Sequence, residues 1–190
     1  MQQIRRLGET RSLAGTIERA AAAERAEQWP QALALYGDAL KVEPTLQAAQ
    51  EGVERAEPRA MIDAELQSFL DKPERLYSPA GRDVARNVLE RAAKFATPGT
   101  RLQQQQTRLA QRLREAETPI QVALASDNAT EVQIYRVGKL GLFDQRSLEL
   151  MPGRYTIVGT RQGFRDVRKE LNLLPGAPPP TLVVRCEERI

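Results

Sequence analysis

Basic side chains gather around one glycine in the last third of the chain. They lie a few positions either side of Gly163: Arg161, Arg165, Arg168 and Lys169. Such a cluster could bind a phosphate or an acidic protein surface through charge-assisted hydrogen bonds. Asp166 and Glu170 are interleaved with the cations, so the pattern favours a solvated face that partly neutralises itself. We expect any partner contact in this stretch to come from the exposed side chains of Arg161, Gln162 and Arg165.

Three other groups of residues could be functional sites, but the sequence favours a purely structural role for each. The Gly-rich stretch from Arg136 to Gly141 joins two predicted strands, without the glycine spacing or the helix N-terminus of a nucleotide-binding loop. Glu187 and Glu188 could act as paired carboxylates, but they lie near the end of the sequence without a sign of burial, so we expect them to be surface charge. Cys186 follows a strand alternation, which predicts a buried, unreactive thiol.

Composition excludes several classes of chemistry. The 190 residues include no His, so Ser-His-Asp and Cys-His mechanisms and His-containing zinc sites cannot be built from this chain. A single Cys cannot form an intrachain disulfide. The formal net charge is only +3, from 28 basic and 25 acidic residues, which does not favour nucleic-acid binding. We expect a protein that is not an enzyme and that has no cofactor, no metal and no nucleic-acid partner.

Apolar residues recur at helical spacing through the first part of the chain. The pattern predicts five helices, over residues 12–28, 30–43, 46–70, 79–95 and 98–116. Thr45, Ser78 and Thr97 are predicted N-caps, since each hydroxyl can accept a hydrogen bond from a free amide group. Pro58 is expected to kink or restart the third helix, and the run 103–106 of glutamines is expected on a solvated face. The predicted buried faces of the last two helices contain Val84, Val88, Leu89, Ala92, Phe95, Leu102, Leu109, Leu113 and Ala116.

The first helical hairpin resembles a tetratricopeptide repeat. The likeness rests on four positions that match the second half of that repeat in register, namely Ala32, Tyr36, Ala39 and Pro44, with Ala20 at the small-residue position of the first half. Thr16, Arg19 and Ala23 occupy the signature Trp, Leu and Tyr positions, which is a departure from the family pattern. The resemblance implies one degenerate repeat, and the alternative is an ordinary amphipathic hairpin. Trp29 and Tyr36 could line a peptide groove, but their positions make them hairpin packing residues first.

Composition changes at Thr118 and Pro119, where helix formers give way to strand formers and frequent turn signals. Six strands are predicted, over residues 120–125, 131–137, 146–150, 155–159, 164–173 and 181–186. Alternation along these strands predicts an inward-facing set of Val122, Leu124, Val132, Ile134, Leu148, Leu150, Tyr155, Ile157, Val167, Leu171, Leu173, Leu182, Val184 and Cys186. We therefore predict an α+β chain in two segregated domains, all-α over 1–118 and an antiparallel β-sandwich or open barrel over 119–190.

The stretch 148–167 resembles the PEGA-type domain, a β-sandwich module of bacterial surface and envelope proteins. The resemblance rests on Pro152, Gly153 and Tyr155, followed by Gly163 and Phe164. The Pro-Glu-Gly-Ala turn that gives the family its name is replaced here by Met-Pro-Gly-Arg, so this turn matches the family only in part. The resemblance implies interaction or scaffolding and offers no catalytic residue to transfer.

The two resemblances together imply a scaffolding or protein-binding module on the periplasmic side of a bacterial envelope, with the cytoplasm as the alternative location. No apolar run approaches the ~20 residues of a membrane span. The resemblance to envelope proteins implies a membrane anchor upstream of Met1. The alternative function is binding of cell-wall glycan or another polymer through the β domain. A row of exposed aromatic residues on one sheet face would favour it, and the candidates are Tyr135, Phe143, Tyr155 and Phe164.

Overall fold

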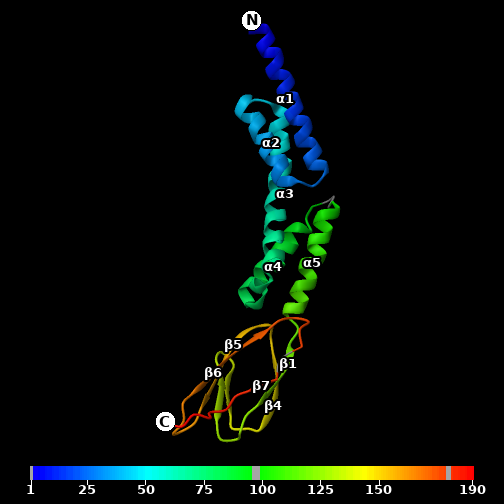
Figure 1. The fold of residues 1–190 in the computed structure, drawn as a ribbon. Helices are drawn as coiled ribbons and strands as arrows, with labels where there is room; N and C mark the ends of the chain where they lie inside the picture. Colours follow the sequence, from blue (N-terminus) through cyan, green and yellow to red (C-terminus); the bar gives the residue numbers. More distant parts are fainter. Residues whose placement is uncertain (1, 96–98, 179–180) are drawn as a thin grey trace. The chain divides into compact units, whose positions relative to one another are not determined.

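The computed structural model describes residues 2–95, 99–178 and 181–190 (Figure 1). In this part of the chain, five α-helices and one 3-10 helix precede seven strands. Helices and strands occupy separate parts of the sequence, which confirms the predicted α+β fold class. The chain divides into two compact units. The helical unit contains the residues up to Lys72 and Val84–Ala110, and the strand unit contains Pro73–Asp83 and Gln111–Ile190.

The helices follow the predicted pattern, with differences at their ends. Their bounds are α1 Gln2–Arg25, α2 Trp29–Val42, α3 Gln47–Asp71, η1 Pro73–Tyr77, α4 Pro79–Ala92 and α5 Thr100–Ala116. α1 begins earlier than predicted, and α3 runs through Pro58 without the expected restart. Ala56 and Ala60 are buried on either side of this proline, and tertiary packing of this kind can outweigh a local helix-breaking preference.

Two of the predicted N-caps can be compared with the structure. Ser78 is confirmed, because its Oγ accepts a hydrogen bond from the backbone N–H of Gly81 at 3.1 Å. The prediction for Thr45 is wrong, because the N-cap of α3 is Leu46 and no side chain caps it. The Thr45 hydroxyl instead donates to Glu43 Oε1 at 2.5 Å. Thr97, the third predicted cap, lies outside the described residues together with Pro98.

The N-terminus of α5 is capped by a residue that is distant in sequence. The carboxylate of Glu27 accepts hydrogen bonds from the backbone N–H groups of Arg101, at 2.9 Å, and Leu102, at 3.3 Å. A Cβ atom at Gly99 would lie 2.2 Å from this carboxylate, so glycine leaves the space that the cap requires. Glu27 thus ties the turn after α1 to the start of α5.

Alanines and one tyrosine form the core between α1, α2 and α3. The buried members are Ala20, Ala23, Ala32, Tyr36, Ala39, Ala49 and Ala56. The ring of Tyr36 lies so close to α3 that a Cβ atom at Gly52 would be 2.5 Å from it. The Tyr36 hydroxyl donates to Glu24 Oε2 at 2.8 Å. The small residues predicted in this hairpin are therefore packing residues.

Two predictions for the last two helices need correction. Gln105, expected on a solvated face, is 5% exposed and donates through Nε2 to the buried carboxylate of Asp63 at 2.9 Å. Arg101 pairs with the same carboxylate through Nε at 2.7 Å. In α4, Val84 is 50% exposed and Ala85 is buried in its place. Apolar periodicity identified the helices but not these polar contacts or the rotation of α4.

The strand unit contains two sheets. The strands are β1 Ile120–Ala125, β2 Glu131–Ile134, β3 Gly138–Gly141, β4 Gln145–Leu150, β5 Gly153–Thr160, β6 Val167–Leu173 and β7 Leu182–Val183. The first sheet has the order β4-β1-β7 and the second has the order β3-β2-β5-β6. Their apolar faces share one core, in which Val122 and Leu124 of the first sheet meet Ile134 and Ile157 of the second. Every residue predicted to face inward belongs to this core, packs against it or, as for Cys186, is buried.

Some strand boundaries differ from the prediction. Gly138–Gly141, expected as a turn, forms β3, and the strand predicted to start at Phe164 starts at Val167. The last strand contains only Leu182 and Val183, and it pairs with β1 in parallel, whereas all other paired strands in the described chain are antiparallel. Glycines in β3 lowered its strand propensity, but pairing with β2 supplies the hydrogen bonds that stabilise it.

The segment after β7 links the two sheets. The Val184 N–H donates to Ala125 O at 2.8 Å in the first sheet. The Cys186 N–H donates to the buried Thr130 Oγ1 at 3.0 Å, and its Sγ lies 3.3 Å from Gly159 O in the second sheet. Cys186 is 3% exposed, which confirms the prediction of a buried thiol.

Candidate functional site

The three residues predicted to contact a partner follow β5 in the turn toward β6. Arg161 Nη1 lies 3.3 Å from Asp127 Oδ2, and its guanidinium lies 4.3 Å from the centroid of the Phe164 ring. Arg165 Nη1 lies 3.1 Å from both carboxylate oxygens of Glu188, with both side chains exposed. The two arginines thus have partners outside the turn, and not the neighbouring acidic residues that the sequence pattern suggested.

Asp127 is held by its own turn as well as by Arg161. Its Oδ1 accepts hydrogen bonds from the backbone N–H groups of Ala129, at 3.1 Å, and Thr130, at 2.8 Å. Burial raises the pKa of Asp127, but these hydrogen bonds and the Arg161 charge outweigh burial and lower the pKa below its usual value. The carboxylate is therefore charged at neutral pH and fixes one end of Arg161.

Arg161 and Gln162 line a broad hollow at this end of the strand unit. The hollow measures about 500 Å³ and is also lined by Ala129, Glu131, Leu142, Thr160 and Asp166. We call it the turn hollow. Leu142 is 56% exposed, so an apolar side chain lies among charged and amide groups. Arg165 does not line the turn hollow, and its ion pair with Glu188 is of the exposed kind that contributes about 1 kcal/mol or less.

Leu142 is the functional candidate that sequence reasoning missed. It follows a segment predicted as a turn, and its neighbour Phe143 is only 9% exposed. Two adjacent apolar residues after β3 must point in different directions when the chain is extended. That local signal was present in the sequence, but it could not show which of the two lies in the core.

The other candidate sites have the non-functional surroundings that the sequence predicts. The stretch from Arg136 to Gly141 forms the end of the β2–β3 hairpin and β3 itself, and so joins strand to strand. Glu187 and Glu188 are exposed and pair with Arg185 and Arg165, respectively. They are surface charge.

The aromatic residues of the strand unit do not form an exposed row within the described chain. Tyr135 is 47% exposed, whereas Phe143 is almost buried. The hydroxyl of Tyr155 donates to Met151 O at 2.8 Å, and Phe164 is covered by Arg161. The row of exposed aromatic residues that would have favoured polymer binding is therefore not observed in the described residues.

Trp29 and Tyr36 do not line an open groove. Tyr36 is 2% exposed, and the Trp29 ring is covered by the guanidinium of Arg59 at 5.3 Å from its centroid. A different groove of about 330 Å³ separates α1 from α2, with Leu13, Leu35 and Val42 among its lining residues. The prediction of hairpin packing for Trp29 and Tyr36 is confirmed.

The remaining features of the described residues concern metals, membranes and relatives. No group of three or more His, Cys, Asp or Glu side chains is arranged there to hold a metal ion. Within the same ranges, none of the helices combines the length and the apolar composition of a membrane span. No protein-family model matches the chain, and no curated protein matches it. The two family resemblances therefore stay predictions.

Proposed function

We propose that this chain is a non-enzymatic protein-interaction module of a bacterial envelope protein and that it binds a protein partner on the periplasmic side through the turn hollow. The observation that carries the proposal is Leu142, exposed among Arg161, Gln162, Glu131 and Asp166. An apolar centre with a polar and charged rim is the usual composition of a protein interface. The envelope location rests on the resemblance of residues 148–167 to the PEGA-type domain.

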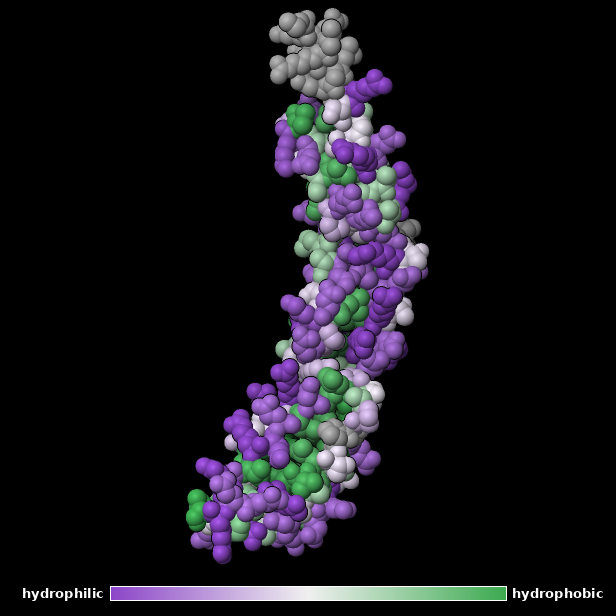
Figure 2. Space-filling model, in the orientation of Figure 1, coloured by the Kyte–Doolittle hydropathy of each residue, from purple (hydrophilic) through white to green (hydrophobic). Residues whose placement is uncertain are grey.

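The distribution of apolar side chains supports an interaction role for the strand unit. Figure 2 shows apolar residues gathered on the visible face of this unit, whereas polar residues cover most of the visible helical unit. Exposed apolar residues that gather on one surface are typical of binding sites. Leu142 is one of the exposed apolar residues of the strand unit.

The proposal predicts that Leu142→Glu weakens partner binding. Burial of a leucine in an interface contributes about 1.5–3 kcal/mol, so we expect binding to weaken roughly ten- to hundredfold. Met61→Glu is the matched control, because Met61 is equally exposed at 56% but lies on α3 in the helical unit. The measurement is affinity capture from envelope extract by the wild-type chain and both variants, followed by quantification of the captured protein.

The expected result is one protein that the wild type and Met61→Glu capture equally and Leu142→Glu does not. Equal capture by Leu142→Glu would exclude the turn hollow as the binding surface. Capture of no protein, together with specific retention on isolated cell-wall polymer, would replace the proposal by the polymer-binding alternative.

A further inference from the structure

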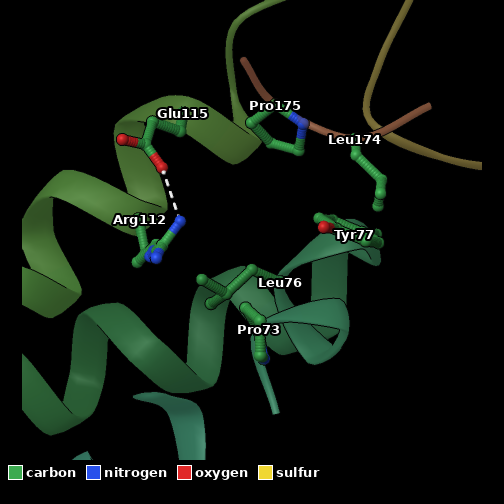
Figure 3. Close-up of a pocket in the computed structure, with 7 residues that line it drawn as sticks. All are labelled: Pro73, Leu76, Tyr77, Arg112, Glu115, Leu174 and Pro175. Atoms are coloured by element: carbon green, nitrogen blue, oxygen red, sulfur yellow. Dashed lines mark hydrogen bonds and ion pairs between the residues drawn. The ribbon is translucent and has the colours of Figure 1, made fainter. Parts of the chain in front are cut away.

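A second pocket lies elsewhere in the strand unit and does not involve the turn hollow. Its volume is about 210 Å³. Figure 3 shows its walls, which come from three separated segments: Leu76 and Tyr77 of η1, Arg112 and Glu115 of α5, and Leu174 and Pro175 after β6. We call it the η1 pocket. All of its lining residues belong to one compact unit.

The η1 wall is held in place by close backbone contacts. A Cβ atom at Gly81 would lie 1.8 Å from Arg75 O, so the start of α4 approaches η1 as closely as only glycine allows. Arg82 Nη1 donates to Leu76 O at 3.1 Å. Leu76 itself is 1% exposed. The apolar floor of the pocket is therefore preformed.

The rim of the η1 pocket contains hydrogen-bond donors without a protein partner among the described residues and a carboxylate that accepts from its own helix. Both carboxylate oxygens of Glu115 accept from its own helix, Oε1 from Gln111 at 2.9 Å and Oε2 from Arg112 Nη1 at 3.3 Å. Arg112 Nε and Nη2 make no hydrogen bond within the described ranges, and neither does the Tyr77 hydroxyl. The η1 pocket thus offers unused donors on Arg112 and Tyr77, and those of Arg112 are cationic.

The two donors belong to opposite walls. In Figure 3 the hydroxyl end of Tyr77 is turned toward the side on which Arg112 lies, and Leu76 points into the space between them. Burial, and then the charge of Glu74, raises the pKa of Tyr77. The hydroxyl therefore stays protonated and able to donate at neutral pH.

We infer that the η1 pocket binds the C-terminal residue of a partner protein, with its carboxylate at Arg112 and Tyr77 and an apolar side chain against Leu76 and Leu174. An arginine and a hydroxyl match the acceptor oxygens of a carboxylate. The volume is below the ~300 Å³ at which sites begin to enclose drug-sized ligands, so it accommodates about one residue. A chain end fits better than a free acid, because its preceding residues add contacts outside so small a pocket.

The test uses a short peptide that ends in leucine, acetyl-Gly-Ser-Gly-Leu, and the same peptide with a C-terminal amide. Both are titrated into the full chain at neutral pH, and the backbone amide resonances of Leu76, Tyr77 and Leu174 are followed by NMR. The free carboxylate is expected to shift these resonances saturably, and the amide to bind about tenfold more weakly, because it loses a hydrogen bond to a charged group.

Three variants separate the contributions to binding. Arg112→Gln is expected to weaken binding of the free acid about tenfold, and Tyr77→Phe about fivefold. Arg114→Gln removes the same charge from an exposed position on the same helix that does not line the pocket, and it should bind like the wild type. Unchanged resonances away from the pocket confirm that each variant is folded.

Several outcomes would overturn the inference. These are equal binding of acid and amide, wild-type binding by Arg112→Gln, or no saturable shift up to the solubility limit of the peptide. Binding of free isocaproate as tightly as the peptide would assign the pocket to a small carboxylic acid and not to a protein. None of these outcomes depends on Leu142, so failure here and failure of the proposed function are distinguishable.

Discussion

Asp127 shows how one carboxylate can fix both a turn and a distant cation. Its side chain accepts two backbone hydrogen bonds from the residues that follow and faces Arg161. Because its pKa is lowered in the folded chain, its contribution to stability is complete above the unfolded-state pKa of about 3.9. The contribution is lost as the pH falls through the lower folded-state pKa.

Replacing Asp127 by asparagine should therefore destabilise the chain in a pH-dependent way. Asn keeps an acceptor oxygen but loses the charge, so we expect a loss of about 1 kcal/mol at pH ~7 for this partly exposed group. Below pH ~4 the loss should shrink, because the wild-type carboxylate becomes protonated too. Urea denaturation of both proteins across this pH range measures the difference. Asp166→Asn, at an exposed position in the turn between β5 and β6, should change stability little at either pH. A pH-independent difference would show that the charge of Asp127 is not responsible.

Single residues also show what the sequence could and could not predict about the candidate site. The cluster of Arg161, Gln162 and Arg165 was located from its position around a glycine turn. Its ion-pair partners were not, because Asp127 and Glu188 are far from the turn in sequence and are brought to it only by the fold. Local charge pattern therefore predicts that a face is neutralised, but not by which residues.

At the scale of helices, the contact of α2 with α3 depends on the absence of one side chain. The Tyr36 ring occupies the space that a Cβ atom at Gly52 would need, and the ring is fully buried. A glycine inside a helix normally weakens it by about 1 kcal/mol relative to alanine. Here the close packing of two helices offsets that loss.

Gly52→Ala and Gly37→Ala should consequently have opposite effects. Gly52→Ala forces the buried Tyr36 ring to shift, which should cost about 1–3 kcal/mol as overpacked cores do. Gly37 lies within α2, and nothing lies within 4 Å of a Cβ atom built there. Gly37→Ala should stabilise the chain by about 0.5–1 kcal/mol. Thermal unfolding followed by circular dichroism at 222 nm, the helical signal, compares the two, and stabilisation by Gly52→Ala would contradict the packing argument.

Some helix N-termini are capped by a neighbouring residue and others by a residue that is distant in sequence. Ser78 caps α4 from the residue next to its start, so the sequence pattern predicted it. Glu27 caps α5 from 74 residues away in the sequence, and no window of neighbouring residues contains that information. Strand β3 was missed for a related reason, since its glycines are poor strand formers and only pairing with β2 makes it a strand.

For the whole molecule, the division into units differs from the division by composition. Composition changes between α5 and β1, but the strand unit also contains Pro73–Asp83 and the end of α5. Tyr77 of η1 lies near β5, because a Cβ atom built at Gly153 would be 3.9 Å from the Cβ atom of Tyr77. A helical segment belongs to the strand unit when most of its contacts are with that unit. Sequence composition cannot predict these contacts.

Hydrogen exchange can test whether Pro73–Asp83 unfolds with the strands. Leu171→Ala removes a side chain that is 2% exposed in the core of the strand unit, which should cost about 2–5 kcal/mol. We expect amide exchange to accelerate in 73–83 together with 120–173, because local openings follow cooperative units. Residues 12–72 and 84–95 should keep their protection. Leu66→Ala, in the core of α3 at 0% exposure, is the matched lesion and should give the reverse pattern. Protection of 73–83 that falls with Leu66→Ala and not with Leu171→Ala would assign this segment to the helical unit.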